Sequence, residues 1–240
     1  LSAVVLEVSP RRVVVVRQDG EPIEITGEGL KPVQSGLSDK AGPNIKIRPG
    51  AVVRIVKVDE KSWRITQLPE VEAAFVALDP RNGRIAALVG GFDFNKSKFN
   101  HVTQAWRQPG SSFKPFVYSA ALEKGLTPMT VVNDAPLFYS ANETGGKPWE
   151  PKNYDGQFEG PMSVRRALAK SKNMVSIRVL QLVGTQSAQD WVTRFGFEAD
   201  KHPPFLTMAL GAGSVTPLQM VTGYAVFANG GHRVAPVLIT

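Results

Sequence analysis

The sequence predicts an α+β protein, in which an antiparallel sheet with packed helices is preceded by a small β-barrel of OB type. The chain has 240 residues, of which 42% are apolar, so it can bury the core of one large or two modest domains. Residues 1 to about 69 alternate with the period of two that is typical of strands, whereas helical periodicity dominates from about residue 70. We therefore expect a barrel domain over residues 1–69 and an α+β domain over residues 70–240.

Short β-rich segments fill the predicted barrel domain. Asp19-Gly20 lies between two of them and favours a tight hairpin, and residues 43–50 are expected to form a loop. Trp63 is the only aromatic residue before residue 70, which is too little for a platform that stacks single-stranded nucleic acid. A spacer or partner-docking barrel is therefore favoured. The expected strands are Ser2–Val8, Arg12–Arg17, Pro22–Thr26, Val52–Val58 and Trp63–Leu68.

The second domain is predicted to begin with a β-hairpin and to continue as helices. Two apolar strands, residues 71–79 and 84–91, flank a turn signal. A packed helix over Ser112–Lys124 is ended by Gly125, and the Gly/Pro/Asn-rich residues 133–160 are expected to be a functional loop or loosely ordered. The other expected helices are Ser163–Ala169, Met174–Val183, Ser187–Phe195 and Leu218–Ala228, the last opened by Thr216-Pro217.

Composition excludes several kinds of site. The chain has no cysteine, so disulfides and thiolate chemistry are absent, and His101, His202 and His232 show no ligand spacing for zinc. The net charge of +7 suggests a nucleic-acid partner, but the basic residues are spread along the chain and favour a solvated surface, which also suits an anionic cell wall or membrane. No apolar run approaches the ~20 residues that span a bilayer. We expect no metal, no cofactor, no nucleic acid, and an internal segment of a longer protein.

One serine–lysine pair has the spacing for acyl transfer without a histidine. Ser111 and Lys114 lie three residues apart where a helix is predicted to begin, so their side chains face the same side. A lysine whose pKa is lowered by burial can take the hydroxyl proton, and the backbone N–H of Ser111 at a helix start is half of an oxyanion hole. By spacing alone, a helix cap with an exposed lysine is the commoner explanation. Ser112 competes as nucleophile, but Pro115 stands three residues on.

A second polar triplet, Ser171-Lys172-Asn173, follows between two expected helices. Ser171 and Asn173 can therefore occupy a rigid corner. Ser140 and Asn142 have the same spacing but fall in a polar loop. The inter-helix position favours Ser171 and Asn173 as partners of the serine–lysine pair.

Together, these segments resemble the transpeptidase domain of class A (bifunctional) penicillin-binding proteins, the serine acyltransferases that cross-link peptidoglycan. The first half is similar to the OB-like domain that some of these enzymes carry. The matching blocks follow one another in order through most of residues 71–236 and are highly specific in combination. They are Arg107–Pro115, Trp149–Gly156, Ala167–Asn173 and Ala209–Leu218, with Tyr224–Gly231 extending the last.

The resemblance implies a role for each candidate residue. Ser111 is the implied acylated nucleophile, Lys114 its base, Ser171 a proton relay to the leaving group, and Asn173 a partner of the substrate peptide and of Lys114. The implied activity is that of a D,D-transpeptidase, which acts on D-Ala-D-Ala stem peptides and is acylated by β-lactam antibiotics.

For the full-length protein the resemblance implies further parts and partners. These are a peptidoglycan glycosyltransferase domain and a membrane anchor outside this segment, and a location at the periplasmic face of the bacterial inner membrane. A cell-wall or lipoprotein partner on the OB-like domain is also expected.

The third motif of the family, Lys-Thr-Gly, is missing from the sequence. In the family that strand supplies the second oxyanion donor and binds the substrate carboxylate. We expect a truncated chain and not a degenerate enzyme. Since losing one oxyanion donor costs about 10²–10³ in rate, the segment alone should be weak or inactive. The alternatives are a D,D-carboxypeptidase or β-lactamase-like hydrolase, a non-catalytic penicillin-binding sensor and, more distantly, a nucleic-acid-binding barrel.

Overall fold

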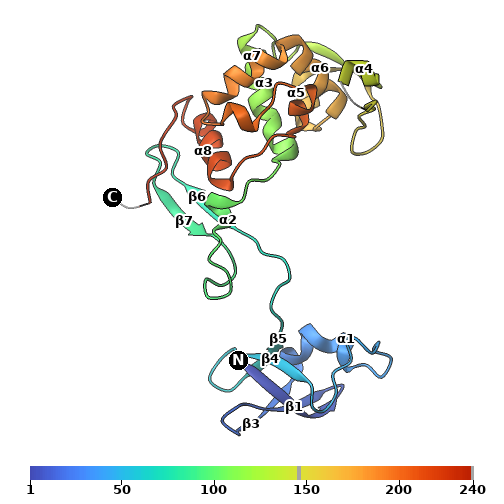
Figure 1. The fold of residues 1–240 in the computed structure, drawn as a ribbon, viewed down its shortest axis with the longest axis vertical. Coiled ribbons are helices and arrows are strands. Elements are labelled where there is room, and N and C mark those ends of the chain that lie inside the picture. The colour runs from blue at the N-terminus through green and yellow to red at the C-terminus, as the bar shows by residue number, and fades with distance from the viewer. Residues whose placement is uncertain (145–146, 239–240) are drawn as a thin grey trace. The chain divides into compact units, whose positions relative to one another are not determined.

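The computed structural model describes residues 1–144 and 147–238 of the chain (Figure 1). The chain divides between Val71 and Glu72 into two compact units, unit 1 (residues 1–71) and unit 2 (residues 72–240). Each unit has a hydrophobic core of its own. The domain bounds of 1–69 and 70–240 stay a prediction.

Unit 1 is built on a five-stranded antiparallel sheet with the spatial order β3-β2-β1-β4-β5. The expected strands are all present, with ends within about two residues of those predicted, as is usual for strand boundaries. Inward-facing residues such as Val5 and Val13 are buried, as the alternating pattern requires. The strands are β1 (Ser2–Ser9), β2 (Arg12–Val16), β3 (Pro22–Thr26), β4 (Val52–Lys57) and β5 (Trp63–Thr66).

The segment after β3 brings the sheet of unit 1 close to a closed barrel. The 3₁₀ helix η1 (Gly27–Val33) contacts both edge strands, β3 and β5, and is followed by α1 (Gln34–Leu37). A side chain at Gly29 would collide with the carbonyl oxygen of Trp63 in β5, so glycine permits this close approach. The prediction of a nearly closed OB-type barrel is confirmed.

Unit 2 begins with the predicted hairpin and continues as a group of helices (Figure 1). This confirms the predicted α+β architecture. Among the described residues, no helix is both long and apolar enough to cross a membrane. The hairpin strands are β6 (Phe75–Leu78) and β7 (Ile85–Val89), and the helices are α2 (His101–Gln104), α3 (Lys114–Glu123), α5 (Val164–Ala169), α6 (Asn173–Val183), α7 (Thr185–Thr193) and α8 (Pro217–Ala228).

Aromatic packing holds the first turn of α3. Phe116 of α3 is fully buried, and its ring centroid lies 4.8 Å from that of Phe197 and 5.3 Å from that of Tyr224 in α8. Helices α3 and α6 also pack against each other. The residue that opens α3, Lys114, is therefore placed by a rigid core.

The polar stretch over residues 133–160 is not loosely ordered where the structure describes it. Strand β8 (Val131–Asp134) pairs with β9 (Gly160–Ser163), with the short helix α4 (Ala141–Thr144) between them, and Asp134 and Asn153 are buried. The expectation of loose order is wrong because these polar side chains satisfy each other inside the unit and do not face solvent. Residues 145–146 of this stretch lie outside the described residues.

Candidate active site

Ser111 lies in a tight turn immediately before α3. The predicted helix over Ser112–Lys124 is split, because a 3₁₀ helix, η2 (Gly110–Phe113), precedes the α-helix that begins at Lys114. The backbone N–H of Lys114 donates to the carbonyl of Ser111, and side chains three apart in a 3₁₀ helix eclipse each other. Ser111 is exposed, and its backbone N–H has no acceptor among the described residues. This N–H is open to a ligand.

Lys114 is buried and its amine is turned toward a distant segment of the chain. The residue is only 1% exposed. Its Nζ donates to the Ser171 carbonyl at 2.7 Å, to Ser171 Oγ at 2.9 Å and to Asn173 Oδ1 at 2.8 Å. Burial lowers the pKa of Lys114 from 10.5 to about 8. The structure therefore brings Lys114, Ser171 and Asn173 together.

Ser111 joins this group through the shared turn and not through a hydrogen bond. In the described part of the chain, Ser111 Oγ has no hydrogen-bond partner, and the amine of Lys114 is bonded to Ser171 and Asn173 instead. Catalytic hydrogen bonds are often long or misaligned without substrate and tighten in the complex. The spacing of three in η2 places Ser111 and Lys114 on the same side of the turn, and the exposed hydroxyl is not held by a hydrogen bond to any described residue.

Ser171 occupies a strained corner between α5 and α6. Its φ of +54° is the only positive value of a non-glycine residue in the described ranges. This left-handed conformation costs on the order of 1–3 kcal/mol and is concentrated at functional sites. Here it allows the carbonyl and the hydroxyl of one residue to bond to the same amine.

The two buried lysines of this region have opposite surroundings. Lys172 is 2% exposed, and its Nζ lies 3.0 Å from Asp155 Oδ2, 3.2 Å from Glu159 Oε1 and 3.5 Å from Asp134 Oδ2. Lys114 has no carboxylate partner within the part of the chain that the structure describes, only neutral oxygens. A buried ammonium without a counter-charge is costly, so Lys114 is the lysine that can give up its proton and act as a base.

His202 and Gly211 pack against the turn that carries Ser111. His202 is buried and stacks on Phe113 with a centroid separation of 4.6 Å, and burial lowers its pKa to about 4, so the ring is neutral. Gly211, which ends the 3₁₀ helix η4 (Leu206–Leu210), has a φ of +70°. A side chain at Gly211 would collide with the carbonyl oxygen of Gly110, directly before the serine. The position of the turn therefore depends on glycine there.

Several residues of the site lay outside the predicted set. Asp134, Asn153 and Lys172 form the buried support of the Ser171–Asn173 corner, yet Asp134 and Asn153 lie in a stretch whose composition favours a loop. The available signals were the Trp149–Gly156 block, which contains Asn153, and the Ala167–Asn173 block, which contains Lys172; the resemblance gives neither residue a role, and Asp134 lies in neither block.

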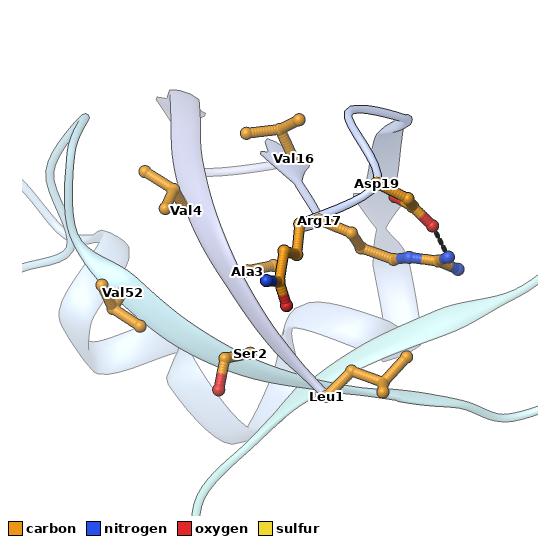
Figure 2. Close-up of a pocket in the computed structure, with 9 residues that line it drawn as sticks. Leu1, Ser2, Ala3, Val4, Val16, Arg17, Asp19 and Val52 are labelled. Atoms are coloured by element: carbon orange, nitrogen blue, oxygen red, sulfur yellow. Dashed lines mark ion pairs between the residues drawn. The ribbon is translucent and has the colours of Figure 1, made fainter.

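Unit 1 carries a separate surface cavity of about 790 Å³ at the start of β1. Figure 2 shows its aliphatic lining, which includes Val4, Val16 and Val52, beside an ion pair between Arg17 and Asp19. Its described lining holds no lysine or histidine that could activate a hydroxyl. We therefore assign the chemistry to the residues of unit 2.

Comparison with known families finds a match for each of the two parts of the chain. The family model for the penicillin binding protein transpeptidase domain matches residues 73–240, and the model for the penicillin-binding protein OB-like domain matches residues 1–71. Penicillin-binding protein 1A of Neisseria flavescens is 44% identical over 100% of this chain, and that of Pseudomonas aeruginosa is 41% identical over 99%. The chain spans 30% and 29% of the length of these two relatives.

Solved structures give the same result. The crystal structure of penicillin-binding protein 1A from Haemophilus influenzae has a TM-score of 0.86 and 36% identity, and the match covers 100% of this chain and 34% of that chain. The structure of PonA1 from Mycobacterium tuberculosis in complex with penicillin V has a TM-score of 0.60 and 26% identity, over 70% of this chain and 47% of that chain. The chain therefore belongs to the penicillin-binding protein transpeptidase family, with an OB-like domain before the transpeptidase domain, and it is similar to penicillin-binding proteins 1A.

Proposed function

We propose that the full-length protein is a D,D-transpeptidase that cross-links peptidoglycan stem peptides through an acyl-enzyme on Ser111. The observation that carries the proposal is the buried amine of Lys114, which has no carboxylate partner among the described residues and is bonded to Ser171 and Asn173. This amine and the exposed hydroxyl of Ser111 leave the same side of one turn. A nucleophile, a base and a group that orients the base are the parts that serine acyl transfer needs.

These residues account for every proton transferred in the two half-reactions. Ser111 Oγ attacks the carbonyl carbon of the penultimate D-alanine, and its proton passes to neutral Lys114. The C–N bond to the terminal D-alanine then breaks, and the leaving amine takes a proton that Ser171 relays from Lys114. In the second half, an amine of a neighbouring stem peptide attacks the ester and gives its proton back by the same route, which frees Ser111.

The hydrogen bonds around Lys114 support this route. Ser171 Oγ lies 2.9 Å from Lys114 Nζ, so the hydroxyl can exchange a proton with the amine directly. The pKa of about 8 keeps Lys114 close to the point where both protonation states are populated. The free backbone N–H of Ser111 can bond to the developing oxyanion. The second oxyanion donor is assigned to a Lys-Thr-Gly strand, which this sequence lacks.

Further parts of the proposal concern the whole protein. β-lactams are proposed to acylate Ser111, since PonA1, 26% identical to this chain, was solved in complex with penicillin V. From the resemblance to class A penicillin-binding proteins, we also propose that the full-length protein is membrane-anchored at the periplasmic face of the inner membrane and carries a glycosyltransferase in another domain; this chain spans 30% of its relative from Neisseria flavescens. The OB-like unit is proposed to dock a cell-wall or lipoprotein partner.

The test is to give the full-length protein a fluorescent penicillin and, separately, paired stem peptides. We expect a stable fluorescent adduct, release of D-alanine, and a cross-linked dimer of the peptides. D-alanine release without the dimer would contradict a transpeptidase and favour a carboxypeptidase. An adduct without either product would favour a sensor, and an adduct that is hydrolysed rapidly would favour a β-lactamase.

Gly211→Ala is expected to slow acylation of Ser111 in the full-length protein by about tenfold or more, because the new Cβ displaces the Gly110 carbonyl beside the nucleophile. The control is Gly125→Ala, at a φ of +91° with open space around the Cβ, which imposes similar backbone strain without the collision. Both rates are measured with the fluorescent penicillin. Equal rates for the two variants would contradict the support that Gly211 is inferred to give to the turn.

A further inference from the structure

A cluster of three buried polar side chains lies behind the Ser171–Asn173 corner. Its members, which we call the corner cluster, are Asp134, Asn153 and Lys172, and they are 0%, 4% and 2% exposed. The proposed chemistry gives none of them a role. Each is bonded to the others or to the residues around them, as buried polar groups must be.

Asn153 connects the cluster to the start of α6. Its Oδ1 accepts from the backbone N–H of Asn173 at 2.8 Å and of Met174 at 3.4 Å, so it serves as a cap supplied by a distant loop. Its Nδ2 donates to Asp134 Oδ1 and to the Gln157 carbonyl, both at 2.8 Å. These contacts fix the orientation of the Asn153 amide. If the amide were rotated by 180°, its NH₂ group would point at the backbone N–H groups of Asn173 and Met174, and its oxygen would point at the oxygens of Asp134 and Gln157.

The same loop also orients the side chain of Asn173. The Nδ2 of Asn173 donates to the carbonyl of Lys152 at 2.8 Å, which leaves its Oδ1 facing Lys114 Nζ. Lys152 immediately precedes Asn153 in the chain. Two adjacent residues therefore hold Asn173, Asn153 through the backbone N–H and Lys152 through the side-chain amide. The orientation of the amide that contacts Lys114 is thus set from the loop.

Lys172 anchors the cluster from the other side. Its ammonium contacts Asp134, Asp155 and Glu159, and it donates to the Gln157 carbonyl at 3.2 Å. Lys172 stands between Ser171 and Asn173 in the sequence, so holding its side chain restrains both neighbours. Its backbone is also bonded, because the carbonyl accepts from the N–H and the hydroxyl of Ser176.

We propose that Asn153 is a positioning residue of the acyl-transfer site, which sets Asn173 and Ser171 against Lys114 by joining the start of α6 to the corner cluster. This inference rests on the proposed function of Ser111. When Asn153 is lost, the corner shifts, so the relay hydroxyl and the amide oxygen no longer meet the amine of Lys114 in the geometry for proton transfer. The affected step is the formation of the ester and not the first encounter with the ligand.

The test compares Asn153→Ala with Asn229→Ala in the full-length protein. Asn229 is a matched residue, because its amide also joins two segments, donating to the carbonyls of Pro80 and His232 and accepting from the N–H of His232. In the described part of the chain, its side chain makes no hydrogen bond to Lys114, Ser171 or Asn173. For each variant, the acylation rate constant k2 and the non-covalent Kd are separated by varying the concentration of fluorescent penicillin, and the melting temperature is measured.

We expect Asn153→Ala to lower k2 by about tenfold or more with a smaller change in Kd, and Asn229→Ala to leave k2 unchanged. Wild-type k2 in Asn153→Ala, or an equal loss of k2 in both variants at equal melting temperature, would overturn the proposal. Labelling of Ser111→Ala, run in parallel, would instead overturn the proposed function itself.

A second pair of variants tests the positioning role of Asn153 if Asn153→Ala does not fold. Asn153→Asp sets two carboxylates against each other, whereas Asp134→Asn combined with Asn153→Asp exchanges the two groups and preserves both the net charge and a hydrogen bond between them. A higher k2 in the double variant than in Asn153→Asp supports the positioning role. A double variant that is no faster than Asn153→Asp overturns it.

Discussion

Ser111→Ala in the full-length protein is expected to abolish covalent labelling by penicillin, while the fold and the melting temperature stay close to those of the wild type. Ser111 is exposed, and its side chain makes no hydrogen bond among the described residues, so removing the hydroxyl costs the fold little. It removes the only atom that the proposal allows to form the ester. The measurement is the fluorescence of the protein after gel separation, beside a thermal unfolding curve.

Ser112→Ala is the matched control for this prediction. Ser112 is the adjacent serine in the same exposed turn, and its contact with Tyr224 uses the backbone carbonyl, which the substitution keeps. We expect Ser112→Ala to be labelled as fast as the wild type. Labelling of Ser111→Ala together with loss of labelling in Ser112→Ala would move the nucleophile to Ser112.

Lys114→Met is expected to slow acylation by about 10²–10⁴, the usual contribution of a general base, without destabilising the protein. Methionine has a similar length and no charge, so it removes the cost of burying an ammonium that has no carboxylate partner in the described residues. Lys172→Met should behave differently in a thermal unfolding experiment. It leaves the buried carboxylate of Asp134 unpaired, and we expect a loss of about 3–5 kcal/mol in the free energy of unfolding.

The pH dependence of acylation distinguishes a base from a merely buried lysine. The pKa of Lys114 is lowered to about 8, so its neutral fraction is about a tenth at pH 7 and most of the total at pH 9. Since neutral Lys114 takes the proton, k2 should rise roughly tenfold over this range and then level off. Lys114→Met should lack this rise. A wild-type rate that is flat between pH 7 and pH 9 would contradict the role of Lys114 as base.

The fold was predictable because the elements of this chain are locally consistent. The strands of unit 1 alternate clearly, and Thr216 followed by proline marks the start of α8, where the structure has the full capping box with Gln219. The start of α3 was less well predicted, because the 3₁₀ turn before Lys114 packs against His202 and Gly211, about ninety and about a hundred residues later in the chain. Periodicity reports nothing about such long-range contacts.

The candidate site was predictable only in part, for a similar reason. Spacing and resemblance indicate Ser111, Lys114, Ser171 and Asn173, but they do not show that the amine of Lys114 bonds to Ser171 instead of Ser111. The buried cluster around Asn153 was missed because polar residues in a Gly/Pro-rich stretch have the composition of a solvated loop. Only the three-dimensional structure shows that these polar residues are buried and do not form a solvated loop.

The site of the penicillin adduct tests the central claim most directly. The full-length protein is acylated, digested with trypsin and analysed by fragmentation of the peptide Gln108–Lys124, which contains Ser111, Ser112 and Ser119. Our account predicts that the added mass lies on Ser111. An adduct on another residue, or a fully active protein in which this peptide is unmodified, would contradict it.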